Sequence, residues 1–123
     1  MKKTVLIVDD SIFIYEELRY MLADTPFQII GHAKSGEDAV ALYEDLKPDV
    51  ITMDIVLPGI DGLKAARTIR EKHTDAKIIM ISSLAYDDTI EESEKIGACG
   101  FIFKPVEKAF LLETLGKCFP DVQ

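Results

Sequence analysis

The chain has 123 residues, of which 48% are apolar, and its formal net charge is −8. This length and composition suit one compact domain with its own hydrophobic core, and they argue against a disordered chain. The excess of carboxylates argues against binding to the phosphate backbone of a nucleic acid or to an anionic membrane surface.

Five short apolar runs alternate along the chain with five longer amphipathic stretches. The runs are rich in β-branched and aromatic residues, and they lie at residues 5–8, 27–30, 50–53, 78–81 and 101–103. Most are apolar at consecutive positions, which indicates strands buried on both faces. Such strands are typical of a parallel sheet covered by helices.

The stretches between the runs have the apolar spacing of helices: residues 11–24, residues 36–46, a stretch after Asp61 that holds Leu63, Ala66 and Ile69, residues 88–96 and residues 107–118. Ser35 and Asp61 precede the second and third of these as N-caps. Thr89 and Glu92 have the spacing of a capping box at the start of the fourth, and Gly97 follows its end. The order is therefore (βα)5, an α/β fold with a single domain over residues 1–123.

Charged or polar residues follow four of the five runs. Asp9 and Asp10 follow the first run, Asp54 the third, Ser82 the fourth and Lys104 the fifth. In an open parallel sheet the carboxyl ends of the strands meet at one edge, where ligands bind. We therefore expect these side chains to lie close together.

The three acids at this edge need compensation for their charge. Two carboxylates on neighbouring strands, ~5 Å apart, repel by roughly 3 kcal/mol at an effective dielectric constant of about 20. A shared proton or a bound cation would relieve this repulsion. Oxygen ligands favour Mg2+, or Mn2+ in its place, so the sequence predicts a metal site formed by Asp9, Asp10 and Asp54.

The same edge could support phosphoryl transfer. A metal ion, the Lys104 ammonium and the Ser82 hydroxyl could together hold the three equatorial oxygens of a phosphoryl group. Asp54 directly follows a buried run, so it is the expected nucleophile.

These residues carry a resemblance to a known family. Asp9-Asp10, the segment 53–62 (MDIVLPGIDG), the segment 81–83 (ISS) and Lys104-Pro105 occur in the order and spacing of the receiver domain of two-component response regulators. The chain resembles in particular the stand-alone, chemotaxis-type (CheY-like) members. The resemblance implies a doubly wound, flavodoxin-like three-layer sandwich with a central five-stranded parallel sheet of order 2-1-3-4-5.

The resemblance also implies roles for single residues. Asp54 would be phosphorylated, and Mg2+ would be bound by Asp9, Asp10, Asp54 and the backbone carbonyl of Val56. Ser82 would hydrogen-bond the phosphoryl group and move with it, and Lys104 would pair with that group. The Lys104-Pro105 bond would be cis. Phe101 would be the aromatic switch residue, without the hydroxyl that a tyrosine has there.

Two positions that tune dephosphorylation in this family are Val56 and Leu84. Both are apolar here and cannot orient an attacking water, so slow self-dephosphorylation is expected. Apart from catalysing its own phosphorylation and dephosphorylation, the protein is not expected to be an enzyme.

The implied partners are a histidine kinase and a downstream protein target. The target would bind the face formed by the fourth helix, fifth strand and fifth helix, with no nucleic acid and no membrane bound directly. The fourth helix is acidic, so basic groups are expected on that target; its acids are Asp87, Asp88, Glu91, Glu92 and Glu94. We expect a monomer, and leave open whether phosphorylation drives dimerisation.

The cysteines and the N-terminus favour a cytoplasmic protein. The apolar run at residues 5–8 is too short for the core of a signal peptide, and no stretch has the length of a transmembrane helix. Cys99 and Cys118 lack the spacing of a metal-binding pair. Without a secretory signature, we expect two reduced thiols.

Several alternatives stay open at this point. Asp10 could be no more than the N-cap of the following helix, and Phe101 could be a core aromatic residue. The choice of Ser82 over Ser83 as the residue that faces the site rests on the resemblance. His32 and His73 lack an evident partner. Rival functions are a phosphatase of the haloacid dehalogenase type, a flavodoxin-like electron carrier, and a degenerate receiver that acts as a non-phosphorylated interaction module. The phosphatase would need a second acid where Val56 stands, and Asp9-Asp10 would repel the phosphate of a flavin.

Overall fold

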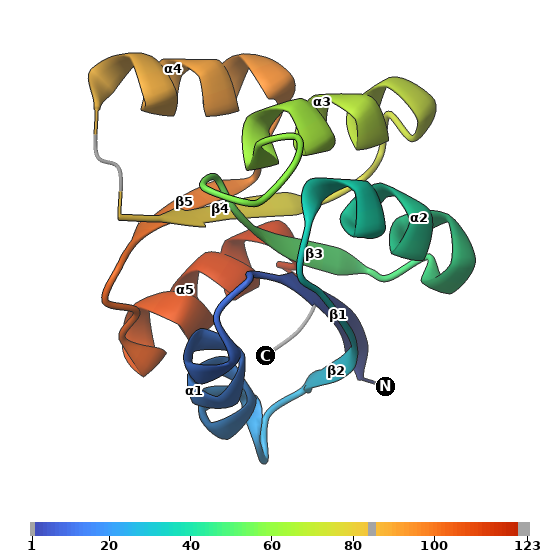
Figure 1. Cartoon of the computed structure of the whole chain (residues 1–123). Coiled ribbons are helices and arrows are strands. Elements are labelled where there is room, and N and C mark those ends of the chain that lie inside the picture. Colours follow the sequence, from blue (N-terminus) through green and yellow to red (C-terminus); the bar gives the residue numbers. More distant parts are fainter. Residues whose placement is uncertain (1, 84–85, 121–123) are drawn as a thin grey trace.

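The computed structural model describes residues 2–83 and 86–120, which form a parallel sheet between two layers of helices (Figure 1). The strands pair in the order β2-β1-β3-β4-β5. Their bounds are β1 Lys3–Val8, β2 Phe27–Ala33, β3 Val50–Asp54, β4 Ile78–Ser82 and β5 Gly100–Phe103. The predicted α/β fold and its 2-1-3-4-5 strand order are confirmed, and the order makes β1 and β3 direct neighbours.

Helices cover both faces of the sheet. Helices α1 (Ile12–Leu22) and α5 (Lys108–Cys118) lie on one face, and α2 (Gly36–Leu46), α3 (Gly62–Lys72) and α4 (Asp87–Ile96) lie on the other (Figure 1). Within the described part of the chain, none of these helices combines the length and apolar character needed to cross a membrane.

The sheet separates two hydrophobic cores. On β3, Val50 packs in the core beneath α1 and α5, whereas Ile51 and Met53 pack in the core beneath α2 and α3. Side chains alternate between the faces of a strand, so a strand with both faces covered must be apolar at consecutive positions. This explains the uninterrupted apolar runs of the sequence.

Most of the predicted helix boundaries are confirmed. Ser35 Oγ accepts a hydrogen bond from the Asp38 N–H at 3.1 Å, and Asp61 Oδ1 accepts one from the Lys64 N–H at 2.8 Å. Gly97 ends α4 in the left-handed conformation, with φ of 97°. Such N-caps satisfy backbone donors that the first helical turn leaves unpaired.

The start of α4 differs from the prediction. Its N-cap is Tyr86, which makes no side-chain capping bond, and the helix begins at Asp87. The Thr89 N–H already donates to the Tyr86 carbonyl at 3.0 Å. Thr89 therefore lies inside the first turn, and the predicted capping box of Thr89 and Glu92 is wrong.

The two cysteines form a disulfide. Cys99 precedes β5 and Cys118 ends α5, and their Cα atoms lie 5.9 Å apart, within the range that a disulfide spans. Both residues pack in the core beneath α1 and α5, where Cys118 is buried. The expectation of two reduced thiols is therefore wrong for this structure, because a sequence separation of 19 residues does not reveal that the two segments lie side by side.

Candidate functional site

Strand pairing brings the predicted site residues to one edge of the sheet. Val8 lies opposite Met53 in the β1–β3 ladder, so the next residues, Asp9 and Asp54, leave their strands side by side. Because β5 lies beside β4 at the same edge, Lys104 can reach back over the sheet.

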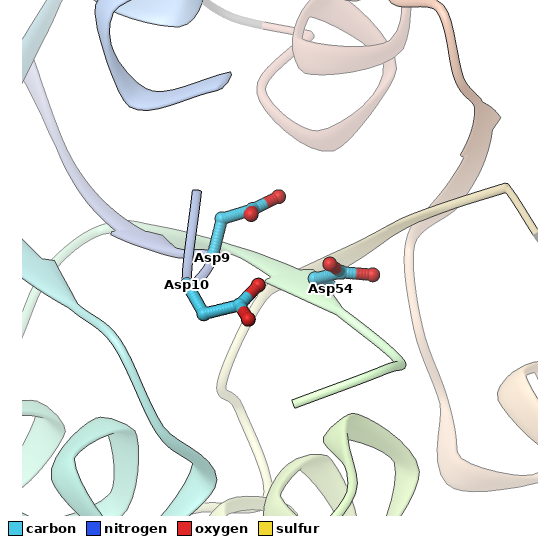
Figure 2. A group of neighbouring side chains, drawn as sticks. All are labelled: Asp9, Asp10 and Asp54. Atoms are coloured by element: carbon cyan, nitrogen blue, oxygen red, sulfur yellow. The ribbon is translucent and has the colours of Figure 1, made fainter. Parts of the chain in front are cut away.

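The three acids form a compact cluster. Carboxylate oxygens of Asp9, Asp10 and Asp54 lie within 4.8 Å of one another, and Figure 2 shows them gathered where β1 and β3 end. Asp9 and Asp54 are buried, with 2% and 5% of their surface exposed, whereas Asp10 is exposed. The cluster thus combines two desolvated carboxylates with one that faces solvent, and it opens to water on the side of Asp10.

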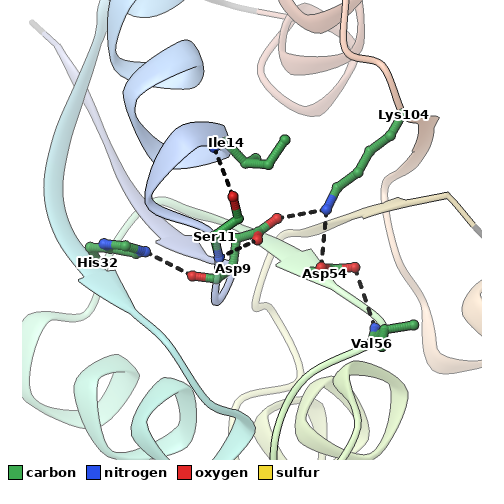
Figure 3. A network of polar contacts seen from close by, with 7 residues as sticks. All are labelled: Asp9, Ser11, Ile14, His32, Asp54, Val56 and Lys104. Carbon is green, nitrogen blue, oxygen red and sulfur yellow. Dashed lines mark hydrogen bonds and ion pairs between the residues drawn. The ribbon is translucent and has the colours of Figure 1, made fainter.

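Lys104 supplies positive charge at the cluster. Its Nζ donates to Asp9 Oδ2 at 2.8 Å and to Asp54 Oδ2 at 3.0 Å (Figure 3). Burial lowers the pKa of Lys104, but the bonds to Asp9 and Asp54 outweigh this effect, so that its pKa is raised. The ammonium therefore stays charged at neutral pH, between two acids.

Asp54 is under opposite influences. Burial raises the pKa of the Asp54 carboxyl, the hydrogen bond and charge of Lys104 lower it, and the charge of Asp9 raises it again. The net direction is upward, because the desolvation of a buried carboxylate is only partly offset by one ammonium. The Lys104 charge alone therefore does not fully compensate the burial of Asp54.

Backbone donors hold the remaining carboxylate oxygens. The Ser11 N–H donates to Asp9 Oδ1 at 2.9 Å, and the Val56 N–H donates to Asp54 Oδ1 at 3.3 Å (Figure 3). Ser11, rather than Asp10, is the N-cap of α1, with its Oγ accepting from the Ile14 N–H. The alternative that Asp10 is only a helix cap is therefore wrong, and its carboxylate remains available to a ligand.

The predicted switch residues lie on β4 and β5. Ser82 ends β4 and is fully buried, whereas Ser83 is exposed. Phe101 is half-buried, packs against the core beneath α2 and α3, and contacts Phe103 with ring centroids 5.2 Å apart. Leu84 lies outside the described residues.

Both histidines have partners that the sequence did not reveal. His32 Nε2 lies 2.8 Å from the Asp9 backbone oxygen, and His73 Nε2 lies 2.8 Å from Glu44 Oε1. These contacts join residues 23 and 29 positions apart, which no local pattern predicts. The statement that neither histidine has an evident partner is therefore wrong.

Comparison with known proteins decides the family. The model of the response regulator receiver domain matches residues 5–116. The chain belongs to the response regulator receiver domain family. Its Lys104-Pro105 bond is cis, as that resemblance implied.

Chemotaxis proteins are among the relatives of this receiver domain. It is 37% identical to the chemotaxis protein CheY of Listeria monocytogenes over 113 residues, which covers 92% of this chain and 95% of that protein. It is 38% identical to the CheY of Thermotoga maritima over 117 residues, which covers 95% and 98%. The receiver is therefore a CheY-like, phosphorylation-dependent response regulator, and the non-phosphorylated alternative is not favoured.

A solved structure shows the same fold. The receiver superposes with a TM-score of 0.92 and 35% identity on a chain of the CheX–CheY–BeF3–Mg2+ complex from Borrelia burgdorferi, covering 95% of this chain and 89% of that one. Family membership also removes the classical enzyme and electron-carrier alternatives, since neither the phosphatase nor the flavin carrier belongs to the matched family.

The donor set fits a divalent cation. Three carboxylates converge, all with hard oxygen atoms, and burial raises the pKa of the Asp54 carboxyl although the Lys104 ammonium partly offsets this effect. Mg2+ prefers such oxygen ligands and keeps several waters, which the exposed side of Asp10 permits. Asp9, Asp10 and Asp54 could thus hold Mg2+.

Proposed function

We propose that this receiver domain, over residues 1–123, accepts a phosphoryl group on Asp54 from the phosphohistidine of a histidine kinase. The observation that carries the proposal is the position of Lys104, whose Nζ contacts both buried acids at 2.8 and 3.0 Å. An ammonium already placed beside the nucleophile can transfer its contact to an incoming phosphoryl oxygen without a large rearrangement.

The transfer is an in-line displacement. An Asp54 carboxylate oxygen attacks phosphorus, the bond from phosphorus to the histidine nitrogen breaks, and the imidazole keeps that electron pair and takes up a proton. Lys104 Nζ exchanges its hydrogen bond to Asp54 Oδ2 for one to a phosphoryl oxygen and keeps its hydrogen bond to Asp9 Oδ2. The Ser82 hydroxyl donates to a second phosphoryl oxygen.

Mg2+, or Mn2+ in its place, supplies further positive charge when bound by Asp9, Asp10, Asp54 and the Val56 carbonyl. The chain's own contribution is to hold these ligands in advance. Ser11 and Val56 donate backbone hydrogen bonds to Asp9 and Asp54, so that neither carboxylate has to be oriented during the reaction.

Phosphorylation of the chain by acetyl phosphate and Mg2+ tests the proposal. Intact mass spectrometry should show the gain of one phosphoryl group in the wild type and no gain in Asp54→Asn. Asp61→Asn is the matched control, because an asparagine N-cap preserves the bond to Lys64. A gain of the same size in Asp54→Asn would assign the modification to another residue and refute the proposal.

The phosphorylated state is proposed to be long-lived. Val56 has 57% of its surface exposed next to Asp54 and carries no polar atom on its side chain, so it cannot orient a water for attack. The measurement is the loss of phosphoryl mass over time in Mg2+ without a phosphatase. Replacement by a residue with an amide, Val56→Asn, should accelerate the loss, and an equally fast loss in the wild type would contradict the proposal.

The signal is proposed to leave through the face formed by α4, β5 and α5. Two partly exposed aromatic residues, Phe103 and Phe110, flank Lys104 and Pro105 there and line a pocket of about 440 Å3. Addition of charge at Asp54 would move Ser82 and repack Phe101, which shifts a two-state equilibrium.

The output target is proposed to be a protein. The receiver is proposed to act in the cytoplasm as a monomer, and whether phosphorylation drives its dimerisation is left open.

The acidic surface of α4 is expected to bind basic groups on that target. Glu92 is already paired with Arg67 of α3, whereas Glu91 is exposed and no ion pair involves it within the described residues. Glu91→Lys should therefore weaken target binding without breaking an ion pair, whereas Glu92→Lys also removes the ion pair with Arg67. Partners captured with and without a beryllofluoride mimic of the phosphoryl group identify the target, and unchanged binding by Glu91→Lys would refute the charge complementarity.

A further inference from the structure

His32 lies beside the acidic cluster although it belongs to an outer strand. It projects from β2, and its Nε2 lies 2.8 Å from the main-chain oxygen of Asp9 (Figure 3). A carbonyl oxygen can only accept a hydrogen bond, so Nε2 carries the proton and donates. The imidazole thus holds a backbone atom of the site rather than a ligand atom.

A second residue fixes the imidazole itself. The ring of Tyr15, on α1, stacks on the His32 ring with centroids 4.2 Å apart and an interplanar angle of 8°. Parallel rings at this separation restrict the rotation of the imidazole about its side-chain bonds. The direction of the Nε2 donor is therefore set by packing between β2 and α1, before any ligand arrives.

The bond completes the restraint of Asp9. Its N–H donates to the Ala33 carbonyl at 3.0 Å, and its two carboxylate oxygens accept from Ser11 and Lys104. Only the Asp9 carbonyl would remain without a partner, and His32 supplies that partner. Asp9 is thereby held at all of its polar groups.

The Asp9 carbonyl belongs to the peptide unit that leads to Asp10. A peptide unit is planar, so a donor that fixes its oxygen also fixes the direction in which the next residue leaves. Asp10 needs this restraint, because its exposed side chain makes no hydrogen bond or ion pair of its own within residues 2–83 and 86–120. Its position relative to Asp54 therefore depends on the backbone that His32 holds.

We propose that His32, supported by Tyr15, is a positioning residue that orients the Asp9–Asp10 peptide and thereby places Asp10 for Mg2+. The inference rests on the proposed function, since it concerns the metal that this function requires. It predicts that His32 sets the affinity for Mg2+ and not the chemistry at Asp54. Restraints of this kind on metal ligands act through ligand geometry rather than through direct contact with the metal.

Calorimetric titration of the metal-free protein with Mg2+ tests the role of His32. Loss of one hydrogen bond should weaken Mg2+ binding by about three- to tenfold in His32→Ala. The glutamine amide reaches as far as Nε2, whereas the asparagine amide reaches only as far as Nδ1. His32→Gln should therefore retain nearly wild-type affinity, and His32→Asn should resemble His32→Ala.

A second histidine provides the matched control. His73 bonds Glu44 on α2, away from the acidic cluster, so His73→Ala should leave Mg2+ affinity unchanged. Phosphorylation by acetyl phosphate adds a kinetic test: His32→Ala should be slow at low Mg2+ and recover the wild-type rate at saturating Mg2+. Thermal unfolding of each variant separates lost affinity from lost folding.

The outcomes distinguish this inference from the proposed function. If the wild type binds Mg2+ and His32→Ala binds it with equal affinity, the role of His32 is refuted while the proposed function stands. The role of His32 is also refuted if His32→Gln binds Mg2+ as weakly as His32→Ala, or if the phosphorylation rate of His32→Ala stays low at saturating Mg2+. Failure of the wild type to bind Mg2+ at all would overturn both proposals.

Discussion

Reduction of the Cys99–Cys118 disulfide should destabilise the protein strongly. The bond closes a loop with a sequence separation of 19 residues. In the chain-entropy model, closure of such a loop in the unfolded state contributes about 3 kcal/mol at 25 °C. A domain of 123 residues unfolds with an entropy of about 0.26 kcal/mol/K, so the loss corresponds to a fall in Tm of about 12 °C.

The assay compares thermal unfolding of the oxidised protein with and without a phosphine reductant, and intact mass confirms the redox state of each sample. Cys99→Ser is the control, because it removes the bond at the less buried of the two positions. Its Tm should match that of the reduced wild type and should not respond to reductant. A difference under about 3 °C between the two wild-type states, or two free thiols after treatment with oxidised glutathione, would refute the reasoning.

Three further predictions concern the site and its surroundings. Thr52 is buried on β3, and its hydroxyl has no hydrogen-bond partner within the described residues. Because a buried polar group without a partner costs free energy, Thr52→Val should raise the free energy of unfolding by about 1 kcal/mol. A lower free energy of unfolding, measured with urea, would contradict this prediction. Burial raises the pKa of Asp54, so the contribution of this carboxyl to stability is present at low pH and is lost as pH rises through the folded pKa. The Tm of Asp54→Asn, measured relative to the wild type in metal-free buffer, should therefore rise with pH. A difference in Tm that stays constant with pH would contradict this prediction. Mg2+ at about 100 times its Kd should stabilise the wild type by about 2.7 kcal/mol, and a chelator should reverse this stabilisation. The stabilisation should be smaller in Asp10→Asn, and an equal stabilisation of that variant would exclude Asp10 as a ligand.

Gly62 lies where α3 approaches the end of β3, and a side chain there would meet the Asp54 carbonyl directly. The close approach lets the Gly62 N–H donate to the Ile55 carbonyl at 2.8 Å, which anchors the loop beside Asp54. Gly62, one of the two glycines in the segment 53–62 that carries the family resemblance, therefore has a steric function. It allows α3 to start immediately beside the end of β3, where Asp54 lies.

The alternation of strands and helices, and the edge where the site forms, followed from the sequence alone. Strands buried on both faces must be apolar at consecutive positions, so runs such as residues 50–53 can be recognised locally. Parallel strands end at one edge, so the sequence predicts that Asp9, Asp54 and Lys104 meet there. Ser35 and Asp61 could be assigned as caps because an N-cap acts on a backbone donor only three residues away.

Contacts between distant segments were decided only by the tertiary structure. The disulfide of Cys99 with Cys118, and the bond of His32 to Asp9, depend on which turns and helices lie beside one another after the crossovers have formed. The start of α4 at Asp87 likewise departs from its local capping signal. Local patterns report the burial and the hydrogen-bonding needs of a segment, whereas the partners that meet those needs are set by packing across the whole sheet.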